Sequence, residues 1–306
     1  MEKQVSSRSD VYTRVTDQIV AQLEAGTRPW LKPWSSSNAD PLGRPVRHNG
    51  VPYRGMNVVL LWAAAADSGF RSSTWMTYKQ AQALGAQVRK GESGSLVVFA
   101  DRYSKTETDE KGDEVEREIP FMKGYTVFNV DQIDGLPDIY RQPEPTAEPQ
   151  DTRSLPEATE AFFAKTGAVF QHGGDRAFYA PGPDVIRLPH RCDFVDVESY
   201  AATKAHELVH WTLHPSRLNR DFASKGFGDE AYAKEELVAE IGAAFLCVDL
   251  GITPEPRADH AAYVASWLRV LKNDKRLIFS AAAHAQRAVD FLHGLQNEGE
   301  EAAGLA

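Results

Sequence analysis

Two histidines and a glutamate near residue 206 have the spacing of a metal site. His206, Glu207 and His210 occur in the pentapeptide His-Glu-Leu-Val-His, an HExxH pattern. On a helix, residues four apart lie one turn above each other, so both imidazoles can reach one metal ion. Glu207 then projects beside them, where its carboxylate can act as general base on an activated water. The pattern predicts a zinc metallopeptidase centre with His206 and His210 as ligands and Glu207 as the catalytic residue.

The sequence around this motif favours a buried helix. No proline or glycine interrupts residues 197–213, and Pro215 follows where the helix would end. Burying two histidines and a glutamate is costly unless they bind a partner, and a metal ion is the simplest one. We therefore expect Zn²⁺, or another divalent metal, at this centre. His214 extends the same ladder, but one straight helix seldom directs three successive turns at one ion, so we expect it outside the ligand set.

A second helical segment, residues 235–246, offers carboxylates for the remaining ligand. Glu236 and Glu240 are four residues apart and share a helix face. In zinc sites of the His, His, Glu type, a glutamate from a following helix completes the ligand set. We assign Glu236 as the ligand and Glu240 as the acceptor that orients a ligand histidine. The alternatives are that Glu240 is the ligand, or that these acids form ordinary surface ion pairs, and we expect Glu235 to be a solvated neighbour.

The charge of the chain is unevenly distributed. Its net charge is −9, yet residues 28–100 contain nine basic and three acidic residues. That window therefore carries +6, and the remainder of the chain carries −15. A mean charge of this sign would argue against a nucleic-acid partner, but the local excess of cations does not.

The same basic window is rich in aromatic residues. Aromatic faces stack on unpaired bases and nearby cations neutralise phosphates, so together they form a surface for single-stranded nucleic acid. No motif that would read a duplex is evident. The competing interpretation is that tryptophans beside prolines belong to the core. The candidate contact residues are Trp30, Trp34, Arg47, Tyr53, Arg54, Trp75, Lys79, Arg89 and Lys90.

Periodicity and composition predict an α+β protein of two domains, each large enough to bury its own core. Residues 1–136 would form an α+β domain, and residues 157–306 a mainly helical domain with a small β-sheet. The segment 137–156, rich in proline and glutamate, would be an extended linker. The charged segment 103–118 would be a protruding hairpin or loop. We expect helices at 10–25, 57–67, 77–84, 155–166, 259–271 and 275–292, and strands at 95–102, 121–129 and within 177–188.

Cysteine content and hydropathy favour a cytoplasmic protein. Cys192 and Cys247 are too few and too far apart for a disulfide framework or a Cys-rich metal site. The first residues lack the apolar stretch of a signal peptide. No run approaches the roughly 20 apolar residues of a membrane span, so we expect no membrane partner.

Several segments, considered jointly, resemble one known family. They include Pro29-Trp30, Pro33-Trp34, Tyr53-Arg54-Gly55, Trp75 to Lys79, Val88 to Glu92, Phe128-Asn129-Val130, His206 to His210 and Ser216-Arg217-Leu218. Over nearly its whole length the chain is similar to ArdC-type antirestriction proteins of conjugative plasmids. The N-terminal domain of that family also occurs in plasmid primases of the TraC type.

The resemblance implies a function on DNA. The N-terminal domain would bind single-stranded DNA without sequence preference and protect incoming plasmid DNA from host restriction. The C-terminal domain would be similar to proteases that remove DNA–protein crosslinks, with a protein or peptide as a second partner. Two alternatives stay open: a DNA-dependent metalloprotease acting on DNA-bound proteins, and a DNA-binding module with a structural zinc site. Tyr263 and His260 are weak candidates for stabilising an oxyanion.

Overall fold

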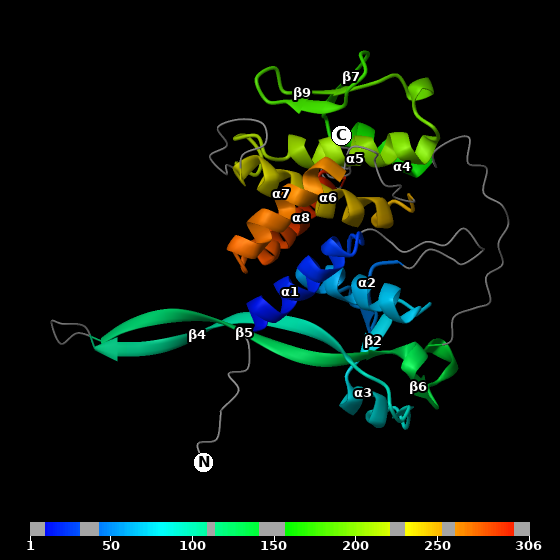
Figure 1. Cartoon of the computed structure of the whole chain (residues 1–306), viewed down its shortest axis with the longest axis vertical. Helices are drawn as coiled ribbons and strands as arrows, with labels where there is room; N and C mark the ends of the chain where they lie inside the picture. The colour runs from blue at the N-terminus through cyan, green and yellow to red at the C-terminus, as the bar shows by residue number, and fades with distance from the viewer. Residues whose placement is uncertain are drawn as a thin grey trace, which may run out of the picture.

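The computed structural model describes residues 10–30, 43–108, 114–140, 157–220, 230–252 and 261–296 of the chain. Helices and strands alternate along the N-terminal half, whereas helices dominate the C-terminal half. In Figure 1 the N-terminal half, coloured blue to green, places helices against a long β-ribbon. The C-terminal half, coloured green to red, is a group of helices with a small sheet at its outer end. The expected α+β class is therefore confirmed.

A long antiparallel hairpin dominates the N-terminal half. Strand β4 (Ser95–Thr108) pairs with β5 (Glu114–Asn129), from Ser95 opposite Val127 to Thr108 opposite Glu114. Residues 103–108 and 114–118 of the charged segment therefore lie in the two strands of a hairpin, as one of the two expectations had it, and both strands are longer than expected. At the base of the hairpin, β5 also pairs with β2 (Thr74–Met76), which runs parallel to β1 (Val46–Arg47).

Local capping explains where the N-terminal helices begin. Asp10 accepts a hydrogen bond from the backbone N–H of Tyr12 at the start of α1 (Val11–Glu24). Thr77 and Gln80 form a reciprocal capping box at the start of α3 (Tyr78–Ala83). These helices and α2 (Met56–Ser68) confirm the three expected from the sequence. A short pair of strands, β3 (Gln87–Val88) and β6 (Ile133–Asp134), completes this half.

The C-terminal half consists of five helices and a three-stranded sheet among its described residues. The sheet has the order β7-β9-β8. The expected strand pair around residues 181–183 is confirmed, whereas the parallel pairing of β7 with β9 was not predicted. The elements are α4 (Glu157–Lys165), β7 (Val169–His172), β8 (Phe178–Ala180), β9 (Val185–Leu188), α5 (Val197–Trp211), α6 (Glu230–Asp249), α7 (Ala261–Asn273) and α8 (Leu277–Gly294).

The two halves share a large hydrophobic core, and a smaller second cluster lies within the N-terminal half. A single cluster of buried side chains runs from α1 and α2 into α6, α7 and α8. The Trp30 ring meets Trp267 edge to face at 5.5 Å, and Trp62 meets Phe245 at 5.7 Å. Polar contacts also join the two halves along this contact surface, called the seam below. Arg44 forms two hydrogen bonds with the Asp249 carboxylate at 2.5 and 2.8 Å. Relative motion of the halves would therefore expose apolar surface.

The segment predicted as a linker begins with ordered contacts. Residues 138–140 form a short 3-10 turn, and the Tyr140 hydroxyl donates to the backbone carbonyl of His48 at 3.1 Å. These residues pack on the N-terminal half, which corrects the expectation of an extended chain from residue 137. Residues 141–156 lie outside the described residues, so the domain boundaries at 136 and 157 stay predictions. No described helix is both long and apolar enough for a membrane crossing.

Candidate metal centre

Helix α5 carries the HExxH motif, as the sequence predicts. The Asp196 side chain caps the first turn by accepting from the backbone N–H of Ser199 at 2.6 Å. Helix α6 lies beside it, and at Gly242 the packing is so tight that an added Cβ atom would meet the Val209 side chain at 3.0 Å. The lack of a side chain at this position lets the two helices come close. The carboxylates of α6 thereby come within reach of the imidazoles of α5.

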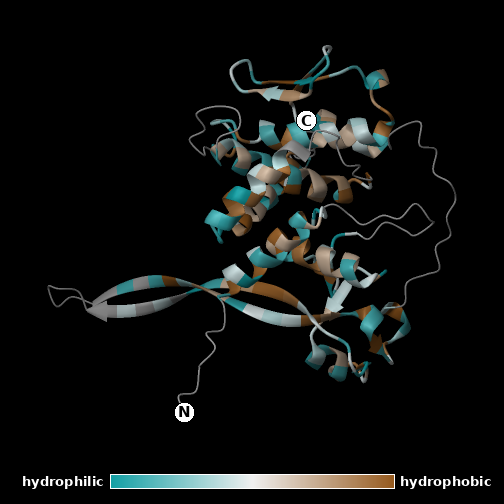
Figure 2. Ribbon diagram, viewed as in Figure 1, coloured by the Kyte–Doolittle hydropathy of each residue, from teal (hydrophilic) through white to brown (hydrophobic). Residues whose placement is uncertain are grey.

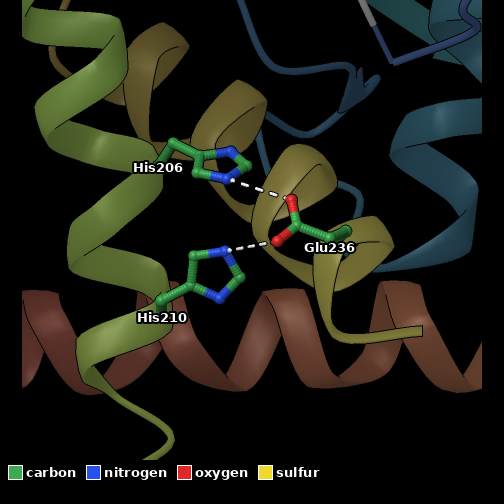
Figure 3. Close-up of side chains that lie close together, drawn as sticks. All are labelled: His206, His210 and Glu236. Carbon is green, nitrogen blue, oxygen red and sulfur yellow. Dashed lines mark ion pairs between the residues drawn. The ribbon is translucent and has the colours of Figure 1, made fainter. Parts of the chain in front are cut away.

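Two imidazoles and one carboxylate converge in this region. Nε2 of His206 lies 3.6 Å and Nε2 of His210 lies 3.5 Å from the Glu236 carboxylate (Figure 3). One ligand atom from each of the three residues lies within 4.8 Å of the others. Nitrogen and carboxylate donors at this separation fit a divalent metal of the zinc type. Among the residues that the structure describes, no other group of three or more His, Cys, Asp or Glu side chains brings its ligand atoms together in this way.

The outer nitrogens of the two histidines face further carboxylates. Nδ1 of His206 lies 3.3 Å from Glu240, and Nδ1 of His210 lies 3.2 Å from Glu235. Such carboxylates fix the ring orientation and the tautomer of a ligand histidine. The position of Glu240 suits the orienting role assigned to it. Glu235 is not the solvated neighbour that we expected, because its side chain is only 13% exposed and contacts His210.

Arg220 holds Glu235 in place. Its guanidinium donates to the two carboxylate oxygens of Glu235 at 2.6 and 2.8 Å. It also donates to the Val209 carbonyl and to the Thr212 hydroxyl, each at 3.0 Å, where α5 ends. The Arg220 side chain is 1% exposed, so its charge depends on Glu235 for compensation. No local sequence signal connects Arg220 to the motif, since the contact exists only in the folded chain.

The electrostatics of the centre follow from its burial. Burial lowers the pKa of the His210 imidazole, but the Glu236 charge and the hydrogen bonds that the ring donates to Glu235 and Glu236 outweigh it and raise the pKa to about 10. Burial raises the pKa of Glu236, and the charge of His210 reverses this and lowers it overall. Burial raises the pKa of Glu235, and the hydrogen bond from Arg220 lowers it below its ordinary value. Without a metal, the centre is an ion-pair network, and a cation would replace its protons.

Tyr232 is a neighbour of the centre that the sequence argument missed. Its hydroxyl hydrogen-bonds to Glu236 and lies 3.2 Å from the hydroxyl of Tyr263. Burial and the Glu236 charge raise the pKa of Tyr232, so its hydroxyl stays protonated and can donate. Tyr232 precedes Glu236 by four residues, so helical spacing could have identified it. Tyr263, a weak candidate for oxyanion stabilisation, thus stands one hydroxyl away from Glu236, and His260 lies outside the described residues.

Glu207 of the motif and the nearby His214 differ in their surroundings. Glu207 is 3% exposed, in keeping with a carboxylate directed into the protein. His214 lies beyond the end of α5, where its Nδ1 is 2.7 Å from the Ser216 hydroxyl. It does not belong to the group of convergent ligand atoms.

The structure corrects the aromatic part of the predicted nucleic-acid surface. The exposed fraction is 0% for Trp30, 1% for Trp75 and 7% for Tyr53. Trp30 packs on Trp267, and the Trp75 ring meets Phe70 at 5.7 Å. A ring whose faces are covered cannot stack on a base, so these residues belong to the core instead. Trp34 lies outside the described residues.

The basic residues that were predicted to contact DNA differ in whether their charge is already paired within the protein. Arg54 forms an ion pair with Asp290 across the seam, and Arg47 lies 5.5 Å above the ring of Tyr53. Arg89 pairs with Glu92 at 2.8 Å and with Asp134 at 3.5 Å. Lys79 and Lys90 are exposed. Some of these cations therefore have their charge paired within the fold, and Lys79 and Lys90 stay available to a ligand.

Comparison with known proteins decides the family. Residues 9–128 match the model of the N-terminal domain of anti-restriction factor ArdC, and residues 157–284 match a zincin-like metallopeptidase. The metal-free crystal structure of antirestriction ArdC protein from R388 plasmid aligns with a TM-score of 0.78 and 48% identity. The alignment covers 94% of this chain and 97% of that one. The chain belongs to the ArdC antirestriction family. The resemblance inferred from the sequence is confirmed.

Further relatives of this ArdC-family chain extend the comparison. The R388 protein has also been solved with Mn(II) bound, and that structure aligns with a TM-score of 0.75 and 47% identity, covering 94% and 98% of the two chains. The protein y4eC of Sinorhizobium fredii is 40% identical over 95% of this chain and 94% of its own length. A DNA primase TraC of Escherichia coli is 42% identical over 92% of this chain. The chain covers only 27% of that primase.

Proposed function

We propose that this ArdC-family protein binds single-stranded DNA without sequence preference and protects incoming conjugative plasmid DNA from host restriction. The observation that carries the proposal is the match to the R388 ArdC protein over 97% of that chain. The cationic excess of residues 28–100 supports a polyanionic partner. The similarity to a DNA primase supports DNA as that partner. Coating of the strand would be sufficient to deny it to a nuclease.

We further propose that the centre of α5 and α6 holds Zn²⁺ and hydrolyses peptide bonds. The ligands would be His206, His210 and Glu236, because their donor atoms converge within 4.8 Å. When bound, a zinc ion lowers the pKa of a coordinated water and polarises a carbonyl group. Glu207 would accept the proton of the attacking water and pass it to the leaving amine. Tyr232, as a protonated donor beside Glu236, would support the negative charge that develops on the carbonyl oxygen.

A second function is favoured by the position of Glu207. A metal site that only stabilised the fold would need no general base, whereas Glu207 is next to a ligand in the motif and is buried. Combined with the proposed DNA binding, this favours a peptidase that acts on proteins bound or crosslinked to DNA. In the opposite case the metal is structural, and the protein acts only by binding DNA.

The decisive experiment measures metal content, DNA affinity and peptide hydrolysis in a single variant. Glu207→Gln should abolish peptide hydrolysis while metal content and single-strand affinity stay at the wild-type level. Glu157→Gln, an exposed carboxylate on α4, is the matched control. If hydrolysis persists in Glu207→Gln, Glu207 has no part in the chemistry. If that variant still protects DNA fully during conjugation, protection depends on binding alone.

A further inference from the structure

The β4–β5 hairpin displays aromatic rings to solvent beyond the helices that cover its base. Phe99 is 47% and Tyr125 is 46% exposed. The Phe99 ring centre lies 6.3 Å from that of Phe121 and 6.3 Å from that of Tyr125. The three rings therefore form a continuous aromatic group. Below, these three residues and Lys123 are called the hairpin patch.

The strand register places the whole patch on one face. Phe99 is opposite Lys123, Phe121 is opposite Asp101, and Tyr125 is opposite Val97. In an antiparallel pair, opposed residues share a face, and every second residue along a strand lies on that same face. Nζ of Lys123 lies 5.2 Å from the centre of the Phe121 ring. The patch thus combines flat apolar surfaces with an exposed cation.

The patch begins where the cover of the core ends. Val97, on the same face, is 6% exposed and belongs to the hydrophobic core, whereas Phe99 two residues further is half exposed. Figure 1 shows the hairpin extending well beyond α1 and α2, and Figure 2 shows hydrophobic colour along β4 up to the region where the cover ends. Rings that are neither buried nor needed to close the core commonly mark an interaction surface.

We propose that the hairpin patch is the base-stacking site for single-stranded DNA. The inference rests on the proposed DNA binding and names the surface that performs it. Unpaired bases offer both faces for stacking on Phe99, Phe121 and Tyr125, while Lys123 contacts a phosphate. Bases in a duplex are already stacked on each other and cannot use these rings. The patch would therefore favour single strands over duplexes.

The distribution of charge along the hairpin indicates toward which end a bound DNA strand would extend from the patch. Residues 104–118 toward the tip contain seven acidic and three basic residues, so this segment repels a polyanion. Asp101 already marks this change at the outer edge of the patch. At the base, a polar cavity of about 620 Å³ is lined by Arg71 and Arg89 together with Glu92 and Asp131, so this end carries no acidic excess, and Lys90 beside it in the sequence is exposed. The strand would run from the rings toward this base and away from the acidic tip.

The test measures binding of a fluorescent oligothymidylate by anisotropy to the full-length protein and its variants. Phe99→Ala and Tyr125→Ala should each weaken binding between about 5-fold and about 150-fold, the range expected for the loss of one base stack. Tyr125→Phe should bind like wild type because the ring remains. Lys123→Gln should reduce the dependence of log affinity on log salt by about one unit. Phe178→Ala, which removes a 45% exposed ring from β8, is the matched control and should have no effect.

A second oligonucleotide separates stacking from charge. Replacing the bases by abasic sites should remove the difference between wild type and Phe99→Ala while phosphate contacts persist. If the wild type binds the strand and both alanine variants bind it with the same affinity, the hairpin patch is not the stacking site, and the proposed function is unaffected. If wild type itself does not bind the strand, the proposed function and the patch fail together. A wild-type dimer that Phe99→Ala converts to monomer, without a change in DNA affinity, would show that the rings serve a second copy of the chain.

Discussion

Nδ1 of His210 lies 3.2 Å from a carboxylate oxygen of Glu235. The other nitrogen of the ring faces Glu236 at 3.5 Å, so the imidazole is held between two carboxylates of one helix. Arg220 in turn holds both oxygens of the Glu235 carboxylate, including the one that faces His210. A chain of contacts therefore leads from a buried guanidinium to a metal ligand. It sets the ring orientation before any metal binds.

We expect Glu235→Gln to weaken metal binding about 10- to 100-fold, as is usual when the outer partner of a ligand histidine is changed. The amide keeps the shape of the side chain but loses the charge that pairs with Arg220 and polarises His210. Metal affinity can be measured by competition with a chromophoric chelator. Glu230→Gln, an exposed residue of the same helix, is the control. Equal affinity in both variants would mean that Glu235 merely neutralises Arg220.

The affinity for metal should rise with pH. The pKa of His210 is raised to about 10 in the metal-free chain, so near pH 7 its imidazole carries a proton that a metal must displace. For the displacement of one proton, affinity rises about tenfold per pH unit until the pH approaches 10. Calorimetric titrations in buffers of different ionisation enthalpy would detect the released proton. Affinity that is constant between about pH 6 and about pH 8 would contradict this account.

The same raised pKa predicts that the stability of the metal-free protein falls as the pH rises, whereas the metal affinity increases. The pKa of His210 is higher in the folded than in the unfolded chain, because its carboxylate partners exist only after folding. Its contribution to the free energy of unfolding is therefore complete below about pH 6.5, the ordinary value for histidine. It is lost as the pH rises through about 10. Chelated protein should accordingly lose stability between these limits, and metal-loaded protein should lose less.

The metal centre could be predicted because its signals are local. Helical spacing alone places His206 and His210 on one face, and the same rule links Glu236 with Glu240. The capping box of Thr77 and Gln80 was equally accessible for the same reason. The assignment of Glu236 as ligand remains a prediction, but the folded chain brings its carboxylate to both histidines.

What the sequence could not provide depends on contacts between distant segments. Composition cannot tell a tryptophan that stacks on DNA from one that stacks on another tryptophan, and Trp30 meets Trp267 from the opposite half of the chain. Conversely, Phe99 reads as an ordinary core residue of a strand until the end of the helical cover is known. The bidentate pair of Arg44 and Asp249 likewise has no local signal.

We expect Trp30→Ala to act on stability and not on DNA contacts. The side chain is fully buried at the seam between the halves, and truncation of a buried tryptophan costs about 3–5 kcal/mol. Chemical denaturation at constant metal concentration measures this loss. Trp30→Phe, which keeps a ring against Trp267, provides a folded variant if the alanine variant does not fold. A Trp30→Phe protein of wild-type stability with weaker DNA binding would restore the original assignment of Trp30 to the DNA surface.

The last prediction concerns Lys204, which anchors α5 on the face away from the metal centre. Its ammonium lies 4.5 Å from the ring centre of Phe163, 4.6 Å from that of Phe170 and 3.4 Å from the Glu160 carboxylate. Burial lowers the pKa of Lys204, and the charge of Glu160 opposes this. The Lys204 side chain is 9% exposed and that of Glu160 is 42% exposed, so water can solvate Glu160 if its partner is removed.

Lys204→Met should therefore match or exceed wild-type stability, because an apolar chain of similar length fills the aromatic cage without the cost of burying a charge. Lys204→Ala leaves that space empty and should lie about 2–5 kcal/mol below Lys204→Met. Unfolding curves of both variants, recorded with and without a chelator, give the difference. If methionine is as damaging as alanine, the cation itself holds α5 against the rings, and its attraction to their faces outweighs the cost of burial.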